Sequence, residues 1–111
     1  MIILPKNSQT IHWTSHSKQK MRYYRLSENR VKRVLRVPAR VEEGIAPETI
    51  AAMQFSGTKK HPTEIWVMYV LFKKPRRIKI ISTWRYPGIT PKGQRPRIPE
   101  DILQELNLKD F

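Results

Sequence analysis

The stretch EIWVMYVLF, residues 64 to 72, constrains the fold most, because apolar side chains occupy both of its alternating sets of positions from residue 65 onward. Successive side chains of a β-strand point to opposite faces of the sheet. A strand that is apolar on both faces must therefore be covered on both sides. The stretch predicts a central strand, with a layer of structure on each face of its sheet.

Shorter segments of β-type pattern precede and follow this strand, separated by turn residues. They span residues 10–14, 39–45, 49–55 and 76–86. Helix-favouring residues fill 15–25, the run from Ser27 to Pro38, and 99–108. The expected order is strand, helix, helix, four strands and a closing helix, which predicts an α+β fold with an antiparallel sheet.

The junction between the first two helices carries recognisable capping residues. Ser27 is a good N-cap for the second helix, and Leu26 before it is placed to pack on Val31 as a hydrophobic staple. Pro38 should end that helix. In the first helix, steps of four put Ser17 and Met21 on one apolar stripe, opposite a basic face.

Charge indicates the class of partner. The net charge is +13, and two basic blocks bracket a nearly neutral centre: residues 1–40 carry ten basic and one acidic side chain, and residues 73–99 carry nine basic and none acidic. Such an excess in a chain of 111 residues favours a polyanion, and RNA, free or ribosome-bound, is the expected partner.

The same sequence argues against several other classes. It has no cysteine for a disulfide or a thiolate metal site, and its three histidines lack the spacing of metal ligands, so neither metal nor cofactor is expected. No apolar run is long enough for a membrane span, and the opening MIILPKNSQ is too short for a signal peptide. We expect one cytoplasmic domain over residues 1–111, with a core at 10–88, a Pro-rich basic arm at 89–99 and a helix at 100–108.

The last predicted strand should present a cationic face. By strict alternation Ile78, Ile80 and Trp84 point one way and the polar residues the other. This predicts a nucleic-acid-binding surface, with Tyr86 as a possible stacking platform. Its polar residues are Arg77, Lys79, Thr83 and Arg85.

Three residues form the candidate catalytic set for RNA cleavage without a metal. Such a reaction needs a base for the ribose 2′-hydroxyl proton, an acid for the leaving oxygen, and cations near the phosphorane. His16 titrates near neutrality, Lys20 lies one helical turn beyond it, and Arg85 could hold the phosphate.

Two segments carry a family resemblance. SHSKQKMRYYRLSE resembles the S-x-H-A-x-x-R-M-x-x-R-x-I-S opening of small bacterial proteins related to the RelE and BrnT toxins, and KIISTWRYPG resembles their closing strand. Lys20 and Tyr24 stand where that pattern has arginines. The resemblance spans about residues 10 to 88 and implies a RelE-like β-α-α-β-β-β-β fold, RNA cleavage of toxin type, and restraint by an acidic antitoxin.

Other interpretations of the same residues stay open. His16 could instead cap its helix or hydrogen-bond a strand, and Arg85 could serve packing rather than anion binding. The chain could be a nucleic-acid-binding module without chemistry, or an interaction protein that holds an acidic antitoxin-like partner. Fold resemblance by itself does not decide among these functions.

Overall fold

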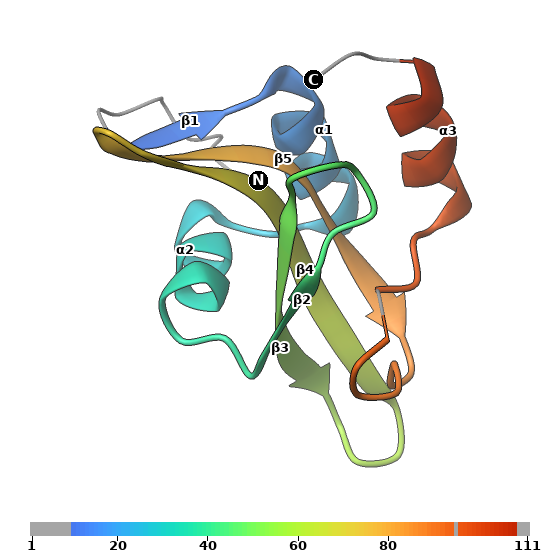
Figure 1. Ribbon diagram of the computed structural model, residues 1–111. Helices are drawn as coiled ribbons and strands as arrows, with labels where there is room; N and C mark the ends of the chain where they lie inside the picture. The colour runs from blue at the N-terminus through green and yellow to red at the C-terminus, as the bar shows by residue number, and fades with distance from the viewer. Residues whose placement is uncertain (1–9, 95, 109–111) are drawn as a thin grey trace.

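The computed structural model describes residues 10–94 and 96–108, and its five strands form one sheet in the order β1-β5-β4-β3-β2 (Figure 1). The predicted domain limits at residues 1 and 111 lie outside the described residues. Along the chain the elements are β1 (Ile11–Trp13), α1 (Ser15–Tyr24), α2 (Glu28–Arg36), β2 (Arg40–Glu43), β3 (Ile50–Gly57), β4 (Pro62–Lys73), β5 (Arg76–Pro87) and α3 (Glu100–Leu108).

This architecture is α+β, as the sequence predicts, with one departure in the sheet. β2, β3, β4 and β5 pair in antiparallel fashion, but β1 runs parallel to β5. The pairing is continued by Thr14, whose hydroxyl donates to the carbonyls of Ile80 and Ile81 at 2.7 and 3.2 Å. The sheet is therefore mixed rather than wholly antiparallel, because the first strand joins the last one at its edge.

β4 is central, and its residues 65–68 are covered on both faces of the sheet, as expected. Ile65 and Val67 are fully buried in a cluster with residues of α1 and α2, whereas Trp66 and Met68 are fully buried in a second cluster that includes Ile102 of α3. The cover does not reach the end of the strand, where Phe72 is 49% exposed. One end of the sheet is thus left open near the turn between β4 and β5.

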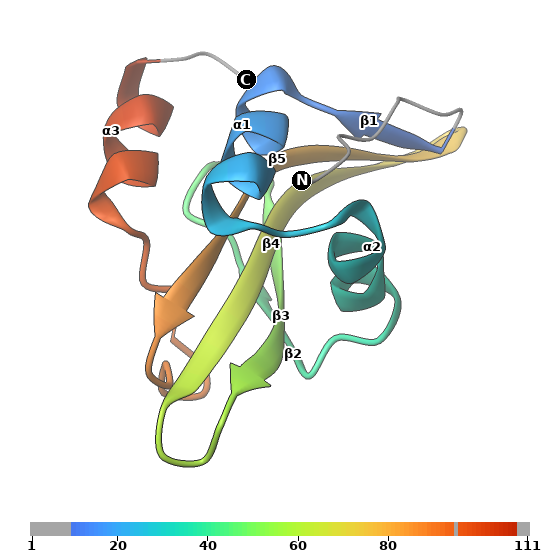
Figure 2. The same cartoon turned by 180° about the vertical axis from the view of Figure 1, so that it is seen from behind.

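The predicted junction of α1 and α2 is confirmed. The Thr14 hydroxyl caps α1 by accepting from the Ser17 amide at 3.1 Å, and the Ser27 hydroxyl caps α2 by accepting from the Arg30 amide at 3.1 Å. Leu26, between the two helices, is fully buried in the cluster that also holds Val31. Both views place α1 between α2 and α3 (Figure 1, Figure 2).

A β-bulge in β5 divides the predicted cationic face. Met68 pairs with Ser82 and Tyr69 with Ile80, so Ile81 is an extra residue in β5. The alternation shifts by one position at this point. Beyond the bulge, Thr83 pairs with Val67 on the α1–α2 face of the sheet. Before the bulge, Lys79 pairs with Val70, which packs on the cluster of the α3 face.

An irregular arm connects β5 to α3 and is attached to the sheet through a buried carboxylate. Glu64 is fully buried and accepts hydrogen bonds from the Thr90 amide (2.9 Å), the Thr90 hydroxyl (2.7 Å) and the Trp66 indole (3.0 Å). The Arg40 guanidinium lies 3.8 Å from Glu64 and also donates to the Thr90 carbonyl. These contacts of Glu64 and Arg40 with Thr90 fix the arm before it leads into α3.

Among the described helices, none is long and apolar enough to span a membrane.

Candidate functional site

The open end of the sheet forms a groove of about 200 Å³ at the β4–β5 hairpin, here called the hairpin groove. Its lining consists of His12, Phe72, Arg77, Ile78 and Lys79. Phe72 and Arg77 are cross-strand partners, as are His12 and Lys79, so the register brings all four side chains together. An exposed aromatic ring on β4 thus shares the groove with two cations of β5 and an imidazole of β1.

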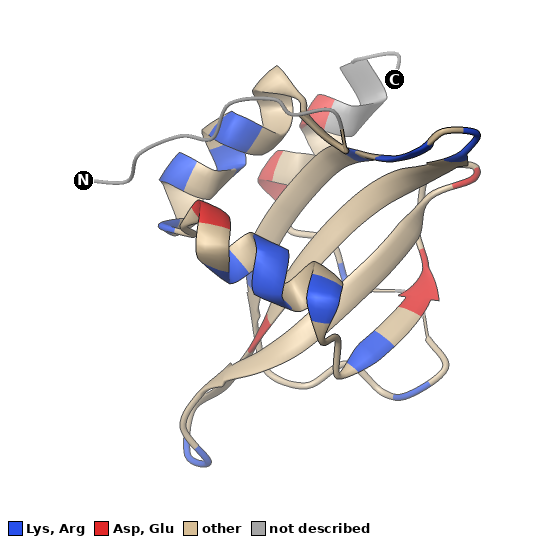
Figure 3. Ribbon diagram, turned by 90° about the vertical axis from the view of Figure 1, so that its left-hand side faces the viewer, with Lys and Arg blue, Asp and Glu red and all other residues tan. Residues whose placement is uncertain are grey.

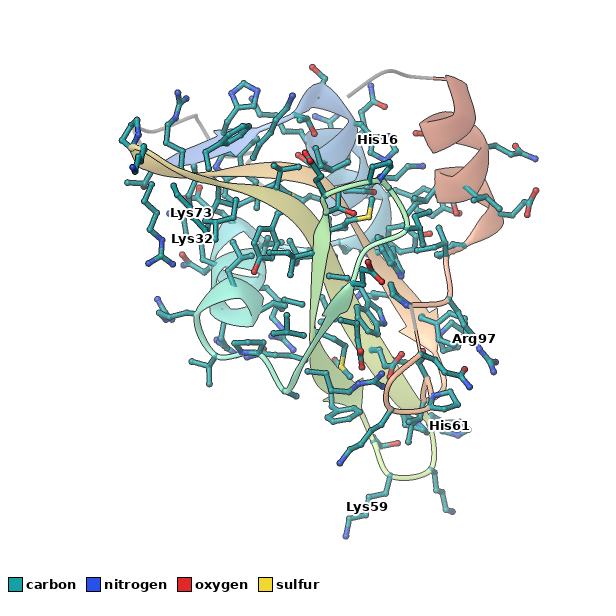
Figure 4. The ribbon with its side chains drawn as sticks, viewed as in Figure 1. His16, Lys32, Lys59, His61, Lys73 and Arg97 are labelled. Carbon is teal, nitrogen blue, oxygen red and sulfur yellow. The ribbon has the colours of Figure 1, made fainter. Side chains whose placement is uncertain are left out.

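The surroundings of the hairpin groove are strongly basic. A second hollow of about 510 Å³ adjoins it through Arg77 and is lined also by Thr10, Pro75 and Arg76. Lys73, Lys74 and Arg76 in the turn are exposed. Lys and Arg lie at the turns at both ends of the sheet and along α1 and α2 (Figure 3), and Lys73 and Lys59 mark these two ends in Figure 4.

A second group of polar residues lies between α1 and α3, and we call it the α1–α3 cluster. Its members are His16, Lys20, Tyr24, Asp101 and Glu105. The Lys20 ammonium donates to Asp101 at 2.8 Å and to Glu105 at 2.7 Å, and the Tyr24 hydroxyl donates to Asp101 at 2.9 Å. His16 and Lys20 are each only 6% exposed. Figure 4 shows His16 on the side of α1 that faces α3.

The ionisation of this cluster is tightly coupled. Burial alone would lower the pKa of Lys20, but the hydrogen bonds to Asp101 and Glu105 outweigh it and leave that pKa above its ordinary value. Burial likewise opposes ionisation of Asp101, yet the bonds from Lys20 and Tyr24 hold its pKa below the usual range. The hydrogen bond from Lys20 lowers the pKa of Glu105 as well. Lys20, Asp101 and Glu105 are therefore charged partners at neutral pH.

His16 is held at both ring nitrogens. Nε2 lies 2.9 Å from the Ser82 hydroxyl and Nδ1 lies 2.8 Å from the Glu105 carboxylate. The order hydroxyl, imidazole, carboxylate is that of a hydrolase triad. Ser82, however, is fully buried, so no substrate carbonyl can reach its oxygen in this conformation. The arrangement instead fixes the orientation of the imidazole.

The other predicted site residues lie apart from both places. Arg85 donates from Nε to the Tyr24 carbonyl at 2.8 Å, at the carboxyl end of α1 and on the α1–α2 face. Thr83 is fully buried and donates to the Trp66 carbonyl at 2.6 Å. Tyr86 is half-buried and its hydroxyl accepts from Arg97 at 3.2 Å. The structure thus brings His16 to Lys20 and Arg77 to Lys79, but it does not bring Arg85 to either pair.

Two parts of the hairpin groove and the α1–α3 cluster were not predicted from the sequence. His12 and Phe72 were not expected in a site, although each is recognisable as the cross-strand neighbour of a basic residue once the register is known. Asp101 and Glu105 were expected only as part of a closing helix. Their spacing of four residues does place both carboxylates on one face of that helix, which was the available signal.

Comparison with known proteins adds no relationship: no family model, no curated protein and no solved structure matches the chain. The resemblance to RelE- and BrnT-related toxins consequently rests on the motif residues alone. Within residues 10–94 and 96–108, no group of three His, Asp or Glu side chains is placed to hold a metal ion.

Proposed function

We propose that this protein binds single-stranded RNA through the hairpin groove. The observation that carries the proposal is the half-exposed ring of Phe72 in one groove with Arg77, Lys79 and His12. Aromatic rings beside cations stack on unpaired bases while the cations contact the phosphates. A duplex keeps its bases stacked inside the helix, so an exposed ring of this kind favours a single strand.

Charge around the groove supports the same proposal. The exposed Lys73, Lys74 and Arg76 extend the positive potential beyond the groove along the β4–β5 turn. A strand of RNA lying across this turn would release counterions from several phosphates. The cationic surface of α1 and α2 adds to the long-range attraction.

The affinity of matched variants for a short single-stranded RNA, measured by fluorescence anisotropy over a range of salt concentrations, tests this proposal. Arg77→Gln/Lys79→Gln should weaken binding and reduce the slope of log affinity against log salt by about 1.4, at about 0.7 for each lost phosphate contact. Lys59→Gln/Lys60→Gln removes the same charge from exposed positions at the opposite end of the sheet and serves as the control.

Two outcomes would contradict the proposal. Equal losses in both double variants would show that only net charge matters and that the groove has no special role. A wild-type protein without affinity for RNA would instead favour an acidic, antitoxin-like protein as the partner of the same basic surface.

A second candidate function is RNA cleavage of toxin type without a metal, and the α1–α3 cluster favours it. In that reaction the 2′-oxygen attacks phosphorus and the bond from phosphorus to the 5′-oxygen breaks, which leaves a 2′,3′-cyclic phosphate and a 5′-hydroxyl. The imidazole of His16 would accept the 2′-hydroxyl proton, the Lys20 ammonium would stabilise the phosphorane, and water would protonate the 5′-oxygen. The proximity of His16 to the Lys20 ammonium supports these roles, which require α3 to move away first, because His16 Nδ1 faces Glu105, Nε2 faces Ser82, and both His16 and Lys20 are only 6% exposed.

A RelE-like topology is part of this second proposal. It is supported by the order β-α-α-β-β-β-β and by the motif residues around His16 and Met21. Detection of the cyclic phosphate in the presence of a chelator tests the chemistry. His16→Ala should lower the rate by about a hundredfold or more while the RNA affinity measured at the hairpin groove persists.

A further inference from the structure

The buried cation of α1, the Lys20 ammonium, is paired with two carboxylates of α3. The polar atoms of Lys20, Tyr24 and His16 face the carboxylates of Asp101 and Glu105, and both carboxylates come from α3. Burying an ammonium without a partner is costly, so this part of α1 requires an anion. In the closed structure α3 supplies that anion.

Little buried apolar surface attaches the described part of α3 to the protein, apart from its polar contacts with α1. Its backbone does not lie close against another described helix or strand along its length, and Ile102 is its one fully buried side chain among residues 100–105. The irregular arm before it is fixed at Thr90, eleven residues upstream of Asp101. It is also held at Gly93, whose amide donates to Glu42 at 3.2 Å, and at Ile98, which packs on the cluster of the α3 face. Elements with little buried apolar surface open at lower free energy than the core.

We propose that the donors of α1 in the α1–α3 cluster form a phosphate-binding seat, which α3 occupies with its carboxylates until an RNA strand displaces it. The inference rests on the proposed RNA binding at the hairpin groove and assigns a second point of contact to the same RNA. α3 is in this sense an internal competitor of RNA.

The chemistry of the seat is the same for both occupants. Carboxylate and phosphate oxygens each accept charge-assisted hydrogen bonds from ammonium, imidazole and phenol groups. The three donors come from His16, Lys20 and Tyr24, which follow at intervals of four residues along α1 and so share one side of the helix. A phosphodiester placed there would meet the imidazole and the ammonium together.

Geometry links the seat with the hairpin groove. Lys79 of the groove pairs with Val70 of β4, and Ser82, the partner of His16, pairs with Met68. Val70 and Met68 both pack in the cluster on the α3 face of the sheet. Both places therefore open on the same face of the sheet, on either side of the bulge at Ile81. A strand that runs from the groove along β5 on this face reaches the space that α3 fills.

Hydrogen–deuterium exchange of the full wild-type chain tests the displacement without any substitution. Addition of a short single-stranded RNA should accelerate exchange of the α3 amides while the central amides of β4 remain protected. Unchanged or slower exchange in α3, under conditions where anisotropy shows the RNA to be bound, would overturn the inference and leave the proposed function standing.

A charge-matched pair of variants supplies the second measurement. Asp101→Asn/Glu105→Gln should bind RNA about tenfold more tightly than wild type, because apparent affinity rises with the fraction of open seats. Glu48→Gln/Glu100→Gln removes the same charge from exposed positions and should show a much smaller change.

Equal gains in the two double variants would reduce the effect to net charge and overturn the seat. An unfolded Asp101→Asn/Glu105→Gln protein leaves the decision to the exchange experiment on wild type. Absence of any RNA binding by the wild-type chain would contradict both the proposed function and this inference. The RNA affinity of Arg77→Gln/Lys79→Gln tests the hairpin groove independently of the seat.

Discussion

Replacing Lys20 by methionine should destabilise the protein less than neutralising its two partners by Asp101→Asn/Glu105→Gln. The three groups share the same hydrogen bonds but differ in exposure. The Lys20 side chain is 7% exposed, whereas those of Asp101 and Glu105 are 34% and 35% exposed. Which side of the ion pair is removed therefore decides how much solvation the remaining charge can regain.

The magnitudes follow from this asymmetry. In Lys20→Met the apolar side chain fills the buried space, and the two carboxylates turn to water, so the expected loss is about 1 kcal/mol. In Asp101→Asn/Glu105→Gln the ammonium stays buried and keeps only neutral acceptors, which are about half as strong. A loss of about 2–3 kcal/mol is expected, limited by the free energy at which α3 detaches and exposes Lys20 to water.

Urea unfolding at neutral pH measures both losses. Tryptophan fluorescence is a suitable probe because Trp13, Trp66 and Trp84 are all buried. Glu48→Gln/Glu100→Gln is the control and should stay within about 0.5 kcal/mol of wild type. A larger loss in Lys20→Met than in Asp101→Asn/Glu105→Gln would refute the reasoning, because it would mean that the carboxylates depend on Lys20 more than Lys20 depends on them.

Three further predictions follow from burial and ionisation. Val67→Asp places an unpaired carboxylate at a fully buried position of β4 and should abolish the cooperative unfolding transition, whereas a soluble variant with unchanged melting would show that this face is exposed. Glu64→Gln should lower the free energy of unfolding by about 3 kcal/mol, measured with urea. The side-chain amide would point its NH2 group at one or more of the three groups that donate hydrogen bonds to Glu64. An unchanged midpoint would contradict the buried contact with Thr90. The lowered pKa values of Asp101 and Glu105 contribute stability that is present above their unfolded pKa values of about 4 and is lost as the pH falls through the folded values. The protection factors of the α3 amides, which correct for the intrinsic pH dependence of exchange, should therefore decrease below about pH 4, and constant protection there would contradict the ion pairs.

Most of the fold was predictable because local patterns determine its elements. The doubly apolar run of β4 predicted a central strand, and the caps of α1 and α2 fall at Thr14 and Ser27 as short-range hydrogen-bonding rules require. The parallel pairing of β1 with β5 was not predictable in the same way. A three-residue strand carries no signal for its partner, which is chosen by tertiary packing.

The candidate site was harder to predict, because it depends on one register shift and one long-range contact. Strict alternation put Lys79 and Arg85 on one face, but the bulge at Ile81 moves the residues after it to the other face. Ion pairing between Lys20 and Asp101 joins residues 81 positions apart, and no local pattern encodes such a contact. His16 and Lys20 were correctly placed on one side of a helix, yet their burial follows from α3.

Photo-crosslinking of the wild-type protein to a uridine-containing single-stranded RNA, with the modified peptide identified by mass spectrometry, tests the RNA-binding proposal most directly. Bases stacked on an aromatic side chain should crosslink there, so the account predicts modification at Phe72. Phe55 of β3, beside the opposite end of β4, and Tyr23 on α1 are also exposed, by 52% and 68%, and provide internal controls. Crosslinks at Phe55 or Tyr23, with Phe72 unmodified, would contradict RNA binding at the hairpin groove.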